Sequence, residues 1–268
     1  MRLRQQLVFC LHQVMKGEKK MMDFKLNLKK TMLLALGGIF MASSLSFAQP
    51  IRTPEGNMPM VHWAVLESTP GNMQAMGEIG ARTVAPQTAK EAGTYALYGA
   101  IDAKNHDLMR LLEIYESYEA YRIHSTSEAF QDYRAARLPM LKSLKILEAN
   151  GIALEQKTSG VATVVFMHRY EVKPENLAQY QALAKQEAVR AVRDEAGVLG
   201  MFVTSEHDNP NVIHTMEMYE DQAAYEKYAG SAAYKDFQKQ TQGFFVNVHE
   251  VVNLPAKITL SQKGFRHF

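Results

Sequence analysis

From about residue 58 onward, the chain alternates between two kinds of hydrophobic pattern. Short runs rich in β-branched and aromatic residues are typical of strands, whereas apolar residues spaced three or four positions apart are typical of helices. The predicted strands are residues 60–67, 94–102 and 108–115 in the first half, and residues 161–170, 198–205, 212–219 and 245–252 in the second. The pattern therefore predicts a mixed α+β protein whose two halves share one order of elements.

A predicted helix follows the first strand of each half. It begins near Pro70 in the first half and near Pro174 in the second, because proline is tolerated in the first turn of a helix. The expected apolar faces are Met73, Met76, Gly80 and Val84, and Leu177, Tyr180, Ala184 and Ala188. A Glu-Ala-Gly triplet follows each helix, and we expect Gly93 and Gly197 to end the helices as left-handed C′ residues.

Polar residues after the third strands predict further helices. Ser117 and Asp221 are good N-caps for short helices that start directly after those strands. Ser125 with Glu128 has the spacing of a capping box, which predicts another helix running to about Leu138.

The two halves are copies of one unit. An ungapped offset of 104 residues aligns residues 60–133 with residues 164–237 and gives 16 identities in 74 positions. Average composition would give about four or five identities by chance. Identical pairs include Glu67/Glu171, Pro70/Pro174, Asn72/Asn176, Asn105/Asn209, Glu113/Glu217 and Asp132/Asp236. We infer an internal duplication.

Each unit reads as β-α-β-β-α-β, the ferredoxin-like order, which builds an antiparallel sheet with helices on one face. Because one such sheet leaves its other face bare, two units packed sheet to sheet would form a single-chain pseudo-dimeric α/β barrel. The predicted units are residues 58–157 and 160–258, joined by residues 139–160. The last strand of the first unit, near residues 144–154, is the least clear element, because Asn150-Gly151 resembles a turn.

Residues 1–48 have the character of a leader with a secretory signal peptide. Three lysines, at positions 25, 29 and 30, precede an apolar run from Met32 to Phe47, and small residues at Ser46 and Ala48 predict cleavage before Gln49. The run is short for a transmembrane anchor, the alternative interpretation. The predicted protein is exported, to the periplasm or beyond, and its translation could start at Met1, Met21 or Met22.

Removal of the leader changes the charge and the cysteine content. The precursor carries a formal net charge of +2, but residues 49–268 hold 22 basic and 26 acidic side chains. This balance gives no indication of nucleic-acid binding. The only cysteine, Cys10, lies in the leader, so we expect no disulfide and no thiolate chemistry in the mature chain. We also expect no stable membrane anchor after cleavage.

A motif at the end of the third strand occurs in both units. It reads Glu113-x-Tyr115-Glu116-x3-Ala120-x3-His124-x2-Ser127-x2-Phe130, and then Glu217-x-Tyr219-Glu220-x3-Ala224-x3-Tyr228-x2-Ser231-x2-Tyr234. This spacing resembles the strand-to-helix motif of the antibiotic biosynthesis monooxygenase (ABM) family, and the resemblance covers nearly all of residues 58–255. It implies a dimeric α/β-barrel fold whose members bind planar aromatic or polyketide-like ligands. Some members oxygenate phenols or quinols without metal or flavin, others degrade haem, and others isomerise small sugar-derived diones.

The motif also suggests candidate site residues. Tyr115 and Tyr219 replace the tryptophan of the family motif, and each offers a flat face and a hydrogen-bond donor. His124 matches the motif histidine and could take a proton from a phenol, but its counterpart is Tyr228. The candidate catalytic residues are His124, Tyr115 and His62, and the candidate substrate-binding residues are Tyr219, Glu113, Glu217, Trp63, Tyr228 and His168. Aromatic packing, helix capping or simple exposure are the structural alternatives.

Two positions on the first strand of the first unit face opposite sides of the sheet. His62 and Trp63 are adjacent, so only one of them can reach a given cavity. Trp63, the single tryptophan, suits the barrel core, whereas His62 alternates in step with apolar neighbours and is a pocket candidate.

Other chemistries find little support in the sequence. There is no Gly-rich phosphate loop, no nucleophile elbow and no histidine spacing typical of zinc, so we expect no metal and no cofactor. Haem is disfavoured because the position where haem-degrading relatives carry a histidine is Arg134 here and Gln238 in the second unit.

Three functional hypotheses remain. The first is a cofactor-independent monooxygenase that acts on a small phenol, quinol or related planar substrate. The second is a binding or carrier module for a small hydrophobic ligand, and the third is a purely structural pairing of the two units. Since the duplicated chain supplies its own pseudo-dimer, a monomer is the expected state, with further association left open.

Overall fold

The computed structural model describes residues 47–254 and 258–260. The first unit consists of β2 (Met60–Ser68), α2 (Met73–Arg82), α3 (Val84–Thr88), β3 (Thr94–Ile101), β4 (Leu108–Tyr115), α4 (Tyr118–Thr126) and α5 (Glu128–Arg137). The second consists of β7 (Val164–Val172), α6 (Leu177–Asp194), β8 (Val198–Glu206), β9 (Val212–Tyr219), α7 (Gln222–Gly230), α8 (Ala232–Gln240) and β10 (Phe245–Leu254). The α+β fold and its tandem ferredoxin-like units are thus confirmed, including both third strands to the residue.

The strands form one antiparallel ladder in the order β10-β7-β9-β8-β5-β2-β4-β3. The two units meet at β5 (Leu141–Lys157), whose first part pairs with β2 and whose second part pairs with β8. Asn150-Gly151 does not interrupt this strand. The register shifts between Gly151 and Ala153, so the dipeptide sits at a bulge within a 17-residue strand.

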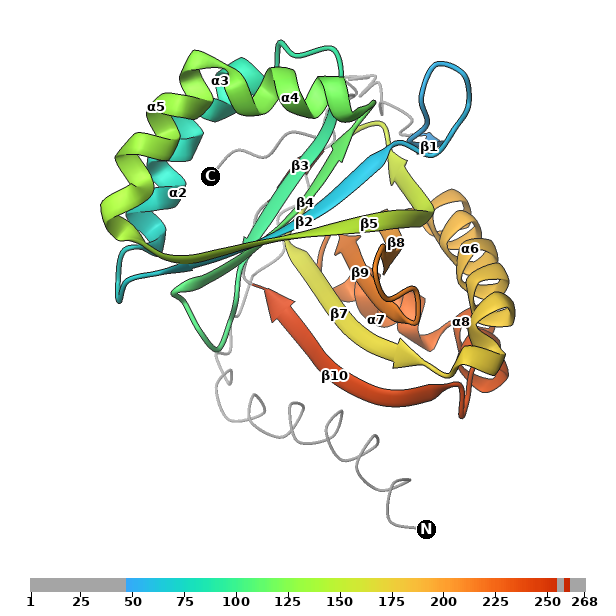
Figure 1. The fold of residues 1–268 in the computed structure, drawn as a ribbon. Coiled ribbons are helices and arrows are strands. Elements are labelled where there is room, and N and C mark those ends of the chain that lie inside the picture. The colour runs from blue at the N-terminus through green and yellow to red at the C-terminus, as the bar shows by residue number, and fades with distance from the viewer. Residues whose placement is uncertain (1–46, 255–257, 261–268) are drawn as a thin grey trace, which may run out of the picture. The chain divides into compact units, whose positions relative to one another are not determined.

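The inner faces of the two half-sheets enclose a common core. Its buried side chains come from both units, for example Tyr98 and Ile114 from the first and Phe202 and Met218 from the second. Helices α2 to α5 cover the outer face of the first half-sheet, and α6 to α8 lie on the opposite side of the molecule (Figure 1). The side chains that face the helices therefore line two separate spaces, one in each unit.

The first helix differs between the units. In the second unit α6 is continuous, whereas in the first unit α2 ends at Arg82 and α3 starts at Val84. Pro86 explains the break, because proline lacks the N–H for a helical bond and its ring clashes with the carbonyl group four residues earlier, that of Arg82. The counterpart of Pro86 is Arg190, which a helix accommodates readily.

Gly93 and Gly197 are not the left-handed helix ends that the sequence predicts. Neither has a positive φ angle. A Cβ atom on Gly93 would lie 2.6 Å from the Cβ of Ala120, and one on Gly197 would lie 2.4 Å from the Cβ of Ala224. The glycines are there to let α4 and α7 approach the backbone closely.

The prediction for the helix caps is confirmed at two positions and wrong at a third. The side chains of Ser117 and Asp221 each accept a hydrogen bond from a backbone N–H in the first turn of α4 and α7. However, α5 is capped by Ser127, whose Oγ accepts from the N–H of Phe130, and not by Ser125. Ser125 lies inside α4, which ends at Thr126.

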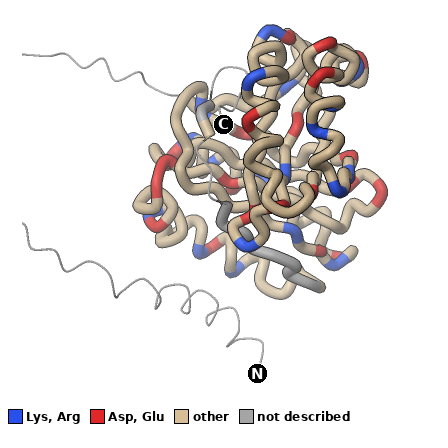
Figure 2. The backbone as a smooth tube through the Cα atoms, turned by 90° about the vertical axis from the view of Figure 1, so that its left-hand side faces the viewer, with Lys and Arg blue, Asp and Glu red and all other residues tan. Residues whose placement is uncertain are grey.

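Several short elements complete the described chain. They are β1 (Ala48–Pro50), β6 (Gly160–Ala162), β11 (Ile258–Leu260) and the 3-10 turns η1 (Leu138–Met140) and η2 (Pro174–Asn176). The predicted leader lies outside the described residues except for its last two positions. Among the helices that are described, none is long and apolar enough to cross a bilayer. Acidic and basic residues are intermingled over the face shown in Figure 2.

Candidate functional site

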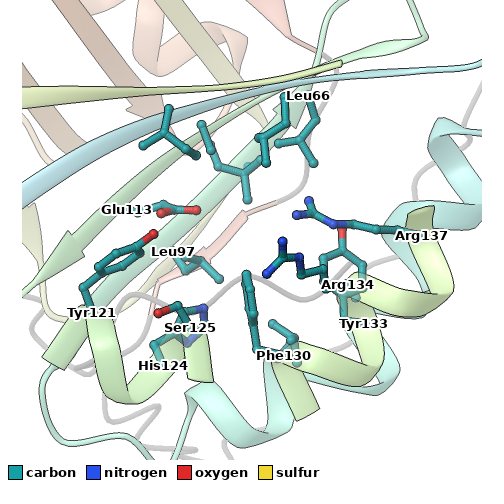
Figure 3. A pocket seen from close by; sticks show the side chains of 18 of the residues that line it. Leu66, Leu97, Glu113, Tyr121, His124, Ser125, Phe130, Tyr133, Arg134 and Arg137 are labelled. Atoms are coloured by element: carbon teal, nitrogen blue, oxygen red, sulfur yellow. The ribbon is translucent and has the colours of Figure 1, made fainter. Parts of the chain in front are cut away.

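The first unit contains a cavity of about 460 Å³ between its sheet and helices α2 to α5. Aliphatic side chains and glycines form most of the wall, among them Ala64, Leu66, Leu97, Gly99 and Leu111. The polar side chains in Figure 3 come from two directions: Glu113 and Tyr121 lie near His124 at one end, and Arg134 and Arg137 lie at the other. A space of this size, apolar with a few polar groups, suits a small organic ligand.

Glu113 presents a carboxyl group to this cavity from the end of β4. The hydroxyl group of Tyr115, two residues further along the strand, donates to its Oε2 at 3.2 Å. Burial raises the pKa of Glu113, although His124, Tyr115 and Arg137 each act in the opposite direction. Burial and the neighbouring carboxyl group also hold the pKa of Tyr115 well above its usual value. Tyr115 therefore orients the carboxyl group and is not itself a base.

His124 and Glu91 form a buried pair at the same end of the cavity. The Nδ1 atom of His124 lies 2.8 Å from Oε2 of Glu91, and both side chains are more than nine-tenths buried. Thr94 donates to the same carboxylate oxygen at 2.9 Å and so fixes its position. When Nδ1 donates its hydrogen to Glu91, the lone pair of the imidazole is on Nε2. This is the arrangement of a general base with an orienting carboxylate.

His62 lies on the helix-facing side of the sheet but is separated from the cavity by two tyrosines. Its ring contacts that of Tyr121 at 4.9 Å between centroids and that of Tyr115 at 6.2 Å. Burial lowers the pKa of His62, while Glu148 acts to raise it. Its side chain lines a second, more open hollow of about 330 Å³ together with Glu148. The structure therefore does not bring His62 to the first cavity.

Trp63 faces the opposite way, into the core between the half-sheets. Its Nε1 donates to Oγ1 of Thr204 at 2.9 Å, and its ring packs against His214 of the second unit. The structure places Trp63 in the contact between the two units and not at a ligand site.

Three further side chains lie at this site without being part of the predicted set: Glu91, Tyr121 and Arg137. Arg137 could have been found from its spacing. It follows Phe130 by seven residues, with Arg134 between them, so the three share one face of a helix. Glu91 was interpreted only as part of the triplet that ends a helix, because nothing local connects it to a histidine 33 residues away.

The matching space in the second unit is filled by aromatic side chains. Ala64 and Leu66 are replaced by His168 and Tyr170, and Met76 by Tyr180. Tyr170 and Tyr180 share a short hydrogen bond between their hydroxyl groups. The cluster continues through Tyr219, Tyr225, Tyr228, Tyr234 and Phe237.

The predicted site residues of the second unit belong to this packed cluster. Burial alone would raise the pKa of Glu217, but His168, 3.6 Å away, and the Tyr219 hydroxyl group, at 2.7 Å, keep it lowered. The ring of Tyr228 occupies the place of His124 and lies under the guanidinium group of Arg190 at 5.9 Å. Glu217, His168, Tyr219 and Tyr228 are thus brought together, but around one another and not around a described cavity.

Among the described residues, no group of three or more His, Cys, Asp or Glu side chains has the arrangement of a metal site.

Comparison with protein families identifies the fold and its duplication. The pattern of the antibiotic biosynthesis monooxygenase family matches residues 59–136 and again residues 163–240. The chain belongs to the ABM family. Membership of the ABM family supports a monooxygenase-like or small-ligand-binding role, and it confirms that two copies stand in tandem. A comparison with curated protein sequences finds no significant match.

Solved structures show the same two-unit fold. A protein from Lactobacillus acidophilus described as a proposed monooxygenase matches with a TM-score of 0.70 at 18% identity, over 79% of this chain and 100% of its own. A proposed monooxygenase from Fusobacterium nucleatum matches with a TM-score of 0.69 at 19% identity, over 78% and 97%. An anthrone oxidase-like protein matches with a TM-score of 0.51 at 10% identity, over 79% and 96%. At these identities the likeness concerns the fold alone.

Proposed function

We propose that the first unit is a cofactor-independent monooxygenase for a small planar phenol, quinol or related substrate. The observation that carries this proposal is the His124–Glu91 pair, 2.8 Å apart, in the wall of a largely apolar cavity. A cavity that only carried a hydrophobic molecule would have no need of an oriented base. The ABM membership agrees with this assignment of chemistry.

His124 begins the proposed reaction by taking a proton from the substrate through Nε2. The resulting anion reduces O2, a C–O bond forms, and loss of water leaves a carbonyl group. For a phenol the overall change is HO–Ar–H + O2 → O=Ar=O + H2O: the hydroxyl group and the oxygenated ring carbon each give up one hydrogen to the water, and the substrate is the only reductant. Glu91 stabilises the imidazolium that forms, as the carboxylate of a catalytic dyad does.

Glu113 and Tyr115 play a supporting role in this scheme. Because the pKa of Glu113 is raised, its carboxyl group can hold a proton and donate a hydrogen bond to a substrate oxygen. Tyr115 holds that carboxyl group in place through its own hydroxyl group. The aliphatic walls exclude water, which protects the substrate anion from being reprotonated.

Oxygen uptake with a panel of quinols, naphthols and anthrones tests the proposal. His124→Gln should lower kcat by about 10²- to 10⁴-fold, the usual contribution of a general base. Glu91→Gln should lower kcat less, since it weakens the hydrogen bond that orients the imidazole of His124. Tyr228→Phe, in the filled second unit, is the matched control and should leave kcat unchanged.

Two results would contradict the proposal. One is oxygen uptake that survives in His124→Gln. The other is a wild-type protein whose melting temperature rises with planar ligands but which consumes no oxygen with any of them, which would identify a binding or carrier module.

We also propose that the protein acts after export, as a monomer. The support is the signal-like leader and the internal pseudo-dimer, in which β5 already joins the two units. N-terminal sequencing of protein from a periplasmic fraction should find Gln49 first, and light scattering should give the mass of one chain. A cytosolic protein that retains Met32 would contradict export.

A further inference from the structure

The end of the cavity opposite His124 carries two arginines. Arg137 is only 7% exposed, and its Nε is buried without a hydrogen-bond partner among the described residues. Its guanidinium group lies over the ring of Tyr133 at 5.0 Å. Arg134 is exposed and reaches into the same space from one turn earlier on α5 (Figure 3).

Neither arginine has an ion-pair partner among the described residues, although Arg137 acts electrostatically on Glu113 from a longer distance. By contrast, Arg110, Arg122 and Arg190 all have acidic partners. Burying a cation without a counter-charge is costly, so such a group commonly serves a charge that arrives with a ligand. A guanidinium group is suited to a planar carboxylate, to which it can donate two parallel hydrogen bonds.

We propose that the substrate carries a carboxylate, which Arg137 and Arg134 bind, at the end remote from the group that His124 deprotonates. This inference rests on the proposed function and adds the substrate class to it: a planar hydroxyaryl carboxylic acid. The aliphatic side chains Leu66 and Leu97, with Phe130, lie between the two polar ends and contact the ring system. The two polar ends thus fix the orientation of the bound substrate in the cavity.

The second unit, whose ligand space is filled, lacks both arginines. At the positions of Arg134 and Arg137 it has Gln238 and Thr241. Thr241 donates back to the carbonyl group of Phe237 in its own helix, so the fold accepts a neutral residue there. The arginines therefore accompany the open cavity and are absent at the equivalent positions of the filled unit.

The test compares a carboxylate with a neutral twin of the same shape. The probes are 6-hydroxy-2-naphthoate and 6-hydroxy-2-naphthamide, and binding to the full mature chain is measured by calorimetry. The wild type should bind the carboxylate about 10- to 100-fold more tightly, the range expected for charge-assisted hydrogen bonds. Arg137→Thr and Arg134→Gln copy the second unit, and each should reduce this preference, with Arg137→Thr reducing it the most.

Two further variants make the result specific. Arg122→Gln, on the exposed surface of α4, should keep the full preference. Arg137→Lys retains the charge but loses the planar fork and should lie between wild type and Arg137→Thr. Circular dichroism of each variant identifies any that fails to fold, in which case Arg134→Gln alone decides.

The outcomes separate this inference from the proposed function. Equal affinity for the two probes, a preference that survives in both arginine variants, or no binding of either probe overturns the carboxylate subsite. If the amide is oxygenated as fast as the carboxylate, the oxygenase proposal stands while the subsite fails. A carboxylate preference that depends on Arg137, with no oxygen uptake, supports the subsite and contradicts the oxygenase.

Discussion

The two units share a backbone and differ in what lies beneath their helices. In the first unit, Ala64 and Leu66 line a cavity of about 460 Å³, and Met76 is buried in the same cluster as Leu66. In the second, Tyr170 and Tyr180 occupy the equivalent positions and hydrogen-bond each other across that space. The difference shows that one fold accommodates either a cavity or a packed aromatic core beneath its helices.

The equivalent carboxyl groups of the two units, those of Glu113 and Glu217, also differ in their surroundings. Both carboxyl groups are half-buried, but burial raises the pKa of Glu113, whereas the pKa of Glu217 is lowered because His168 and Tyr219 compensate for its burial. A carboxyl group with a raised pKa in a cavity is typical of functional sites, and a compensated one is typical of structural sites. The contrast in pKa supports the proposed ligand site in the first unit and a structural role for Glu217 in the second.

The most direct way to break the contrast is to fill the first cavity. The double variant Leu66→Tyr/Met76→Tyr reproduces the Tyr170–Tyr180 pair and should lower the affinity for a naphthol by more than about 100-fold, because the ligand volume is lost. Calorimetry measures the loss. Thermal unfolding should show a change of less than a few degrees, and a double variant that still binds the ligand would show that the cavity is not the site.

Other positions have the same structural role in both units. The clearest example is Gly93, whose counterpart is Gly197. Gly93→Ala should destabilise the protein by about 2–3 kcal/mol, because the new Cβ would lie 2.6 Å from that of Ala120. Denaturant unfolding measures the loss, and Gly197→Ala should cost a similar amount.

Two variants control for the helix contact at Gly93. The additional change Ala120→Gly should recover part of the stability by removing the atom that clashes. Gly230→Ala, where a Cβ meets nothing within 4 Å, should be neutral or stabilising by up to about 1 kcal/mol. A neutral Gly93→Ala would contradict the close-approach explanation.

The sequence predicted what depends on local patterns. The third strands and the caps Ser117 and Asp221 are confirmed, because alternation and capping act within a few residues. Strand β5 was obscure because its two parts pair with different units, so no single pattern runs through it.

The candidate site was predicted only in part, for a related reason. His124 and Glu113 follow from a motif with regular spacing, and the structure brings both to one cavity. Glu91 joins His124 through tertiary packing, and the difference between an open and a filled space depends on the volumes of side chains from several elements. Neither the contact between Glu91 and His124 nor the presence of a cavity can be predicted from the sequence of a single segment.

The contact between the units can be weakened at one hydrogen bond. Thr204→Val should cost about 1–2 kcal/mol, because it leaves the buried Nε1 of Trp63 without an acceptor. Trp63 is the only tryptophan, so its fluorescence reports on this contact during unfolding. Thr215→Val is the matched control on the neighbouring strand. Its buried Oγ1 has no partner among the described residues, so its removal should be neutral or slightly stabilising.

The smallest expected effects have opposite signs in the two units. For Glu113 the folded pKa is raised, so burial of its ionised form costs stability as the pH rises above the usual value of 4.5. Glu113→Gln should therefore be more stable than wild type at pH 7, and the difference should vanish at low pH, where both side chains are neutral. For Glu217 the folded pKa is lowered, so its contribution is present above the usual value and is lost as the pH falls through the folded one. Glu217→Gln should be less stable than wild type at pH 7, and the stabilities of the two proteins should converge in acid. Thermal unfolding between pH 3 and 8 gives both curves, and two variants that shift in the same direction would refute the electrostatic contrast between a ligand site and its packed copy.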